Sequence, residues 1–248
     1  MTGLTEFDID IETADGVMPT FVARPEGSGP YPAIILYMDA PGIREELRDF
    51  TRRFAAQGYY VLLPDMYYRL GLHRFDLKKR TDNMTTMIHA ARTSLTNEGV
   101  MDDTRGMLAS MARDSAASGG PMGCVGYCMS GAYAVTAAGT FPDRMAAAVS
   151  QYGVDIVCDA PDSPHLLADK ITGELYLAFA EHDEWVPPHV VPALTETLDT
   201  AGVTYGLKTW PGTHHGFSFP QRPVYHRDTA EAVWSIMFDL CERRLKVA

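Results

Sequence analysis

The spacing of apolar and polar residues predicts strands that alternate with helices along most of this chain. Several apolar runs are too short for helices and are typical of strands buried on both faces. These runs lie at 32–37, 59–63, 122–125, 146–150, 175–180 and 203–210. Apolar residues at helical spacing between them predict helices over 43–58, 83–95, 99–113, 190–198 and 227–245, and a helical run at 132–138.

The N-terminal segment differs, because residues 7–11 alternate between polar and apolar and residues 20–23 could return beside them around Asp15-Gly16. This pattern predicts a β-hairpin. The remaining order of strands and helices predicts an α/β fold with a mostly parallel sheet, right-handed crossovers and helices on both faces. Because no linker, charge block or repeat interrupts the pattern, we expect a single domain over 1–248.

Composition narrows the classes of protein to consider. At 248 residues and 46% hydrophobic residues, the chain can bury a substantial core. A formal net charge of −11 without a basic patch argues against nucleic-acid binding. No apolar stretch reaches the roughly 18 residues of a membrane span, and residues 1–16 lack the order of a signal peptide. Four widely spaced cysteines fit free thiols in a reducing cytoplasm.

The segment Gly-Tyr-Cys-Met-Ser-Gly at 126–131 follows a predicted strand and precedes a predicted helical run. Strand, sharp turn and helix are the context of the nucleophile elbow of an α/β-hydrolase, with Cys128 in the position of the nucleophile. Gly126 and Ser130 are small enough for the strained turn, and the helix N-terminus would favour the thiolate. The alternative is an inert buried cysteine, so the interpretation depends on the rest of the chain.

An acid and a histidine follow in the order that this fold uses. Asp183 comes after the strand at 175–180, and the pair His214-His215 comes after the strand at 203–210. The histidine would exchange protons with the thiol and the leaving group, and the acid would orient the imidazole. Adjacent residues of an extended segment point apart, so only one of the two histidines can face Cys128. His182 is expected to face solvent.

Taken together, these segments resemble the dienelactone hydrolase family over residues 32 to about 240. The resemblance rests on 37–43, 58–69, 126–131 and 214–217. It implies a single-domain α/β-hydrolase fold, a Cys-Asp-His triad and hydrolysis of a lactone or another ester without a cofactor or metal. The family pattern His-Gly-Phe favours His215 as the histidine of the triad.

The resemblance also implies further site residues. A family glutamate that helps to activate the cysteine corresponds to Asp39, whose alternative role is to cap the helix near Pro41. The backbone N–H groups of Ala40 and Met129 would form the oxyanion hole.

The substrate pocket is less defined by the sequence. The family binds a substrate carboxylate with two arginines, one of which closely follows the histidine, yet here no arginine precedes Arg222. Candidates for the other are Arg69, Arg74 and Arg80. Tyr37, Tyr152, Trp185, Phe217 and Phe219 would line an apolar or aromatic pocket, with core packing as the alternative.

The leading hypothesis is therefore a hydrolase of esters or lactones that forms an acyl-enzyme on Cys128, with a small-molecule substrate and no nucleic-acid or membrane partner. A carboxylesterase acting on neutral esters is the nearest alternative. A metal-binding protein using His182, Asp183, His214 and His215 is a second, although their spacing fits no common ligand pattern. A ligand or redox sensor that keeps a reactive thiol is a third.

Overall fold

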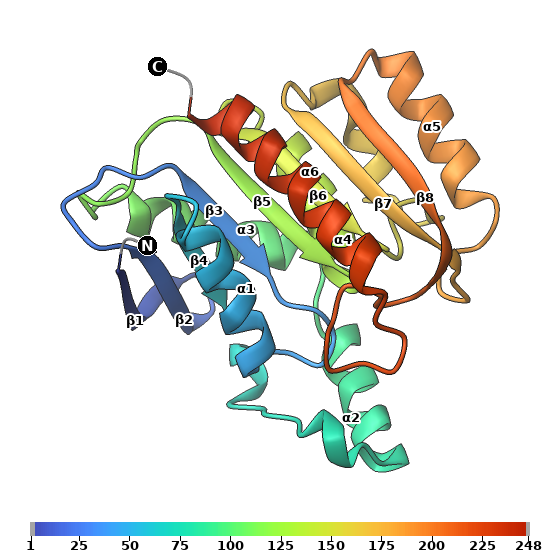
Figure 1. Ribbon diagram of the computed structural model, residues 1–248, viewed down its shortest axis with the longest axis horizontal. Coiled ribbons are helices and arrows are strands. Elements are labelled where there is room, and N and C mark those ends of the chain that lie inside the picture. Colours follow the sequence, from blue (N-terminus) through green and yellow to red (C-terminus); the bar gives the residue numbers. More distant parts are fainter. Residues whose placement is uncertain (1–2, 247–248) are drawn as a thin grey trace. The chain divides into compact units, whose positions relative to one another are not determined.

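The computed structural model describes residues 3–246, and the chain divides into two compact units, one up to Gly120 and one from Pro121. Each unit holds four of the eight strands (Figure 1). Within each unit the described strand pairs are parallel, except that the second strand of the chain pairs antiparallel with both of its neighbours. The α/β class predicted from the sequence is confirmed.

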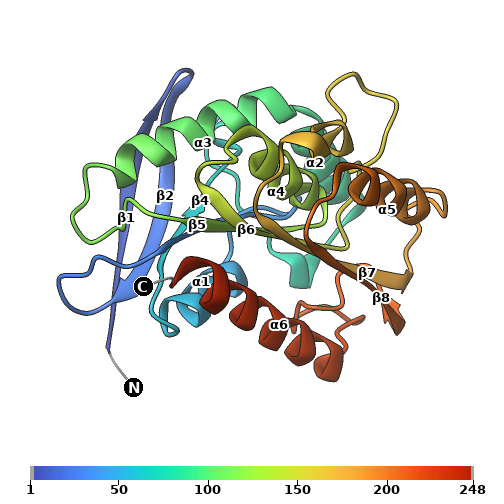
Figure 2. The same cartoon turned by 90° about the horizontal axis from the view of Figure 1, so that it is seen from above.

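The first unit begins with a β-hairpin. Strands β1 (Leu4–Thr13) and β2 (Gly16–Pro25) pair antiparallel, β2 pairs antiparallel with β4 (Tyr60–Pro64), and β4 pairs parallel with β3 (Ala33–Tyr37). Every residue of β3 and β4 is buried, as their apolar runs predict. Helices α1 (Glu45–Ala55), α2 (Asp82–Thr93) and α3 (Asn97–Met111) complete the unit, and α1 and α3 lie on opposite faces of its strands (Figure 2).

The second unit is a four-stranded parallel sheet in the order β5-β6-β7-β8. Its strands are β5 (Met122–Tyr127), β6 (Met145–Gln151), β7 (Glu174–His182) and β8 (Tyr205–His214). Its helices are α4 (Met129–Thr140), α5 (Val190–Ala201) and α6 (Arg227–Leu245). Helices α4 and α5 cover one face and α6 covers the other (Figure 2). The carboxyl ends of β5, β7 and β8 lead directly to Cys128, Asp183 and His215.

The main difference from the predicted elements concerns the ends of the strands around the site. The apolar pattern ends the last strand at Trp210, but β8 continues to His214 through Pro211 and Gly212. Polar and glycine-containing residues extend this strand because they pair with the end of β7, which no local pattern reveals. Three short 3-10 helices at 68–70, 77–79 and 164–170 also escaped prediction. The single-domain organisation stays a prediction.

Candidate active site

Cys128 lies at the turn between β5 and α4 in a conformation that few residues other than glycine adopt. Its φ is 56° and its ψ is −120°. Backbone hydrogen bonds hold it on both sides: its N–H donates to the carbonyl of Gln151 at 3.1 Å, and its carbonyl accepts from Val154 N–H at 3.1 Å. The strained turn is thus enforced by the neighbouring strand end, and the partly exposed thiol is held at the start of α4.

The small residues around Cys128 are required by close backbone approaches. A Cβ atom on Gly126 would lie 1.8 Å from the carbonyl oxygen of Ser130, and one on Gly131 would lie 2.4 Å from the Cα of Gly153. Ser130 itself ties the turn together, because its hydroxyl accepts from Tyr127 N–H at 2.8 Å and donates to the Tyr127 carbonyl at 3.0 Å. The pattern at 126–131 therefore has the geometry that a nucleophile elbow needs.

Asp183 and His215 meet at the ends of β7 and β8. Nδ1–H of His215 donates to the Asp183 carboxylate, with distances of 2.8 and 3.0 Å to its two oxygens. The carboxylate is 3% exposed and the imidazole is 13% exposed. Asp183 is held in turn by the N–H of Trp185, which donates to Oδ1 at 3.0 Å. This arrangement fixes the tautomer of His215 that leaves Nε2 available for proton transfer.

The Nε2 atom of His215 is buried and makes no conventional hydrogen bond among residues 3–246. The Cys128 thiol also interacts with the imidazole of His215. Burial alone would lower the pKa of His215, but the hydrogen bond with Asp183 and the interaction with Cys128 outweigh it and raise the pKa from 6.5 to about 9. A pKa above neutrality favours the imidazolium form of His215, whose positive charge would stabilise a thiolate beside it.

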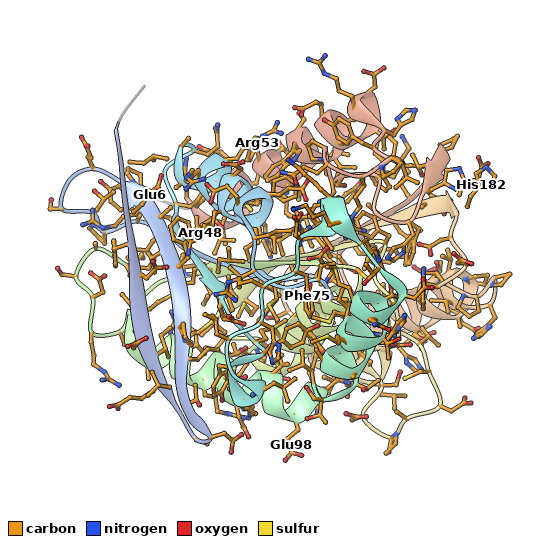
Figure 3. All side chains as sticks on the ribbon, turned by 90° about the horizontal axis from the view of Figure 1, so that it is seen from below. Glu6, Arg48, Arg53, Phe75, Glu98 and His182 are labelled. Atoms are coloured by element: carbon orange, nitrogen blue, oxygen red, sulfur yellow. The ribbon has the colours of Figure 1, made fainter. Side chains whose placement is uncertain are left out.

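The structure separates the two adjacent histidines. His214 is exposed and lies on the far side of the strand end, where its ring is 5.0 Å from the ring of His182. His182 is also exposed and projects outward at the end of β7 (Figure 3). Only His215 turns toward Asp183. Among the described residues, no group of three or more His, Cys, Asp or Glu side chains is arranged to hold a metal ion.

Aromatic side chains surround the imidazole. The ring of Tyr152 meets His215 edge-on at 5.0 Å, and the ring of Phe217 meets Tyr152 at 5.2 Å. Both are fully buried, whereas Trp185 is 45% exposed with its ring 6.4 Å from His215. Tyr152 has a positive φ of 39°, a strained conformation of the kind found at functional sites. Of these aromatic residues, Trp185 is the one placed where an incoming molecule can reach it.

Asp39, Ala40 and Met129 are the other residues predicted to assist the chemistry. The Asp39 carboxylate is fully buried and forms a two-pronged ion pair with Arg44, at 2.5 and 3.1 Å. Helix α1 begins at Glu45 with Arg44 as its N-cap, so the ion pair joins Asp39 to the residue that precedes the helix, and the role of Asp39 in the site stays a prediction. The carbonyl of Ala40 accepts from the Tyr67 hydroxyl at 2.7 Å, which fixes the orientation of that residue. In the second unit, Met129 is the first residue of α4, where N–H groups point out of the helix.

Three other candidates are engaged within the first unit. Tyr37 is fully buried, and its hydroxyl shares a hydrogen bond of 2.8 Å with Thr104. Arg74 pairs with Asp65 at 2.7 Å, and the exposed Arg80 donates to Thr85 at 3.1 Å. The contribution of these three residues to a substrate pocket stays a prediction.

Arg222 lies close to Gly216, the residue after His215, and the sequence does not indicate this proximity. It lies seven positions beyond His215, yet its guanidinium folds back so far that a Cβ atom on Gly216 would be 2.4 Å from its Nη1. It also stacks 4.5 Å above the ring of Phe219. The loop between His215 and Arg222 brings the arginine back to Gly216, and no local sequence pattern predicts this loop.

Comparison with known proteins shows the family and the fold of this chain. The model of the Dienelactone hydrolase family matches residues 18–245. A Methylorubrum extorquens protein named "Putative carboxymethylenebutenolidase" is 27% identical over 241 residues, covering 96% of this chain and 80% of the relative. The crystal structure of a "Putative Dienelactone Hydrolase" from Klebsiella pneumoniae superposes with a TM-score of 0.85 at 24% identity, covering 96% and 98% of the two chains. A dienelactone hydrolase-like promiscuous phosphotriesterase from metagenomic libraries has a TM-score of 0.81 at 18% identity, covering 97% and 98%.

Proposed function

We propose that this carboxylic ester hydrolase, which belongs to the dienelactone hydrolase family, cleaves esters or lactones through an acyl-enzyme on Cys128. The observation that carries the proposal is the arrangement of His215, which is hydrogen-bonded to Asp183 through Nδ1 and also interacts with Cys128. A thiol beside an imidazolium is the pairing that generates a nucleophile at neutral pH.

In the first half of the reaction the thiolate sulfur attacks the ester carbonyl carbon and forms a carbon–sulfur bond. The carbonyl oxygen becomes an oxyanion, which the N–H group of Met129 at the start of α4 would stabilise. When the tetrahedral intermediate collapses, the carbon–oxygen bond to the alcohol breaks and His215 donates its Nε2 proton to the leaving alkoxide. For a lactone, this alcohol stays attached to the acyl group.

In the second half, neutral His215 takes a proton from water and the resulting hydroxide attacks the thioester. Collapse of this intermediate releases the carboxylic acid and restores the thiolate–imidazolium pair. Asp183 keeps its charge throughout and stabilises the imidazolium each time it forms. Burial of the Asp183 carboxylate strengthens this interaction, because few water molecules screen it.

The chemistry of a thiol nucleophile is supported further by the burial of other cysteines. Cys124 and Cys241 are fully buried, and burial raises their thiol pKa values, to about 12 for Cys241 and higher for Cys124. Such thiols are poor nucleophiles. Cys158 is partly exposed, and its backbone N–H donates to the Ser163 hydroxyl, which in turn shares a hydrogen bond with His165. Cys128 is the thiol that combines exposure with a histidine partner.

The test is to trap the acyl-enzyme. Wild-type protein mixed rapidly with p-nitrophenyl acetate should release p-nitrophenolate in a burst and gain one acetyl group, located on Cys128 by peptide mass mapping. Cys128→Ala should show neither the burst nor the modification, whereas Cys158→Ala, the matched control, should behave as wild type. Acetylation of another residue, or turnover by Cys128→Ala above a trace, would exclude this mechanism.

A further inference from the structure

The pairing of β7 with β8 changes register immediately before the acid and the histidine. Ala180 pairs with Trp210, an offset of 30 residues, whereas His182 pairs with His214, an offset of 32. A single residue of β7, Glu181, therefore lies opposite three residues of β8, Pro211, Gly212 and Thr213. This is a β-bulge with two additional residues on β8, and we call residues 211–213 the β8 bulge.

The β8 bulge determines which residue faces Asp183. With the offset of 30 continued, Thr213 would stand opposite Asp183; with the offset of 32, His215 does. A strand rises by about 3.3 Å per residue, so the two additional residues displace His215 along the strand by about 7 Å. The observed hydrogen bond between His215 and Asp183 is 2.8 Å long, and a displacement of this size would eliminate it.

Glu181 holds the β8 bulge with both its side chain and its backbone. Its Oε2 accepts from Gly212 N–H at 2.8 Å, which satisfies a donor that the disrupted ladder would leave without a strand partner. Its own N–H donates to the Thr213 hydroxyl at 3.4 Å, and that buried hydroxyl donates to the Trp210 carbonyl at 2.6 Å. Gly212 has a φ of +69°, the left-handed conformation in which glycine is least strained.

We propose that Glu181 and Gly212 are positioning residues that set the register of His215 against Asp183, and this inference rests on the proposed function of the triad. Both residues act through the backbone of β8. The Glu181 side chain is half-exposed at the strand end beside His182, whose Nε2 is 3.4 Å from Oε2 of Glu181. The groups that face His215 itself are Asp183, Cys128 and the aromatic rings of the site.

Two pairs of variants separate positioning from general stability. Glu181→Gln keeps an oxygen that can accept from Gly212, whereas Glu181→Ala removes it, and Glu196→Ala on the exposed side of α5 is the matched control. Gly212→Asn tolerates the left-handed conformation, whereas Gly212→Val does not. Since no atom lies within 4 Å of a Cβ at position 212, the difference within this second pair reports backbone conformation.

The first readout is the titration of the His215 ring by NMR, assigned by comparison with His215→Asn. We expect Glu181→Ala and Gly212→Val to lower the pKa of His215 by about one pH unit, a tenfold change in its proton affinity. The second readout is kcat/KM for p-nitrophenyl acetate at pH 8, which should fall about two- to tenfold in the same variants, as expected for the loss of one hydrogen bond. Glu181→Gln, Gly212→Asn and Glu196→Ala should remain within about twofold of wild type by that scale.

Wild-type titration of His215 in Glu181→Ala and in a folded Gly212→Val would overturn the inference, as would equal losses in Glu181→Gln and Glu181→Ala. If Gly212→Val does not fold, Gly212→Ala provides the same backbone test with the smallest side chain. The titration does not require turnover, so it decides the role of the β8 bulge even if the wild-type protein hydrolyses no ester. That last outcome would refute the proposed function alone.

Discussion

Replacing Asp183 by Asn tests the electrostatic core of the site, because the two side chains have nearly the same shape and differ in charge. Asp183 accepts the Nδ1–H of His215 at 2.8 Å in a position that is 3% exposed. Burial lowers the pKa of His215, and the hydrogen bond with Asp183 and the interaction with Cys128 raise it to about 9. Without the carboxylate, burial should dominate and the imidazole should become neutral at physiological pH.

The magnitude follows from the difference between the folded and unfolded pKa values of His215. A pKa of about 9 in the folded protein and 6.5 in the unfolded chain corresponds to at most about 3 kcal/mol of stability. Because the folded pKa is the higher one, this contribution is complete below pH 6.5 and disappears as the pH rises through 9. The free energy of unfolding of wild type should therefore decrease across that interval, and Asp183→Asn should lack this decrease.

The assay is urea unfolding of both proteins between pH 6 and 10, with the exposed Asp159→Asn as the matched control. Both proteins keep Cys128, but its ionisation is coupled to that of His215, so the difference between the two curves reports the effect of Asp183 on the Cys128–His215 pair as a whole. In the same samples, kcat should drop by about 10⁴, as when the acid of a serine triad becomes an amide and imposes the wrong tautomer. A difference in unfolding free energy that stays constant from pH 6.5 to 9.5 would refute the reasoning.

The other predictions concern neighbouring parts of the site. His215→Ala should lower kcat by several powers of ten, whereas His214→Ala should stay near wild type in the same assay; the reverse order would assign the base to the wrong residue. Asp39→Asn breaks a buried ion pair and should lower the free energy of unfolding by about 3 kcal/mol or more. If the folded variant also shows slower single-turnover acylation, Asp39 is a partner of the thiol. Gly126→Ala should destabilise the fold by about 3 kcal/mol or more in urea, because its Cβ has no space. Neutral aryl esters should be cleaved about as well as carboxylate-bearing lactones. A hundredfold preference for the carboxylate-bearing lactone, about 2.7 kcal/mol, would require a cation that binds the carboxylate. Loss of this preference in Arg222→Ala would identify Arg222 as that cation.

Local sequence patterns determined most of the framework of this protein. Runs of apolar residues long enough for strands but too short for helices predicted the buried strands, since a strand covered on both faces carries apolar residues at every position. The elbow at 126–131 was also predictable, because the need for small residues around a strained turn acts within six consecutive positions. The assignment of Cys128, Asp183 and His215 to one site was predictable as well, because each residue comes directly after a strand.

Only the tertiary structure decided how these residues meet. The register of β8 depends on the ladder with β7, and a bulge of two residues moves a side chain by about 7 Å without leaving a local signal in an apolar pattern. Loop conformations likewise bring Asp39 to Arg44 and Arg222 to Gly216, and no local pattern specifies these conformations. The periodicity of apolar residues indicates which face of a helix or strand is buried. The distances between residues on separate strands and loops are set only when the chain packs into its tertiary structure. The chemistry of this site depends on those distances.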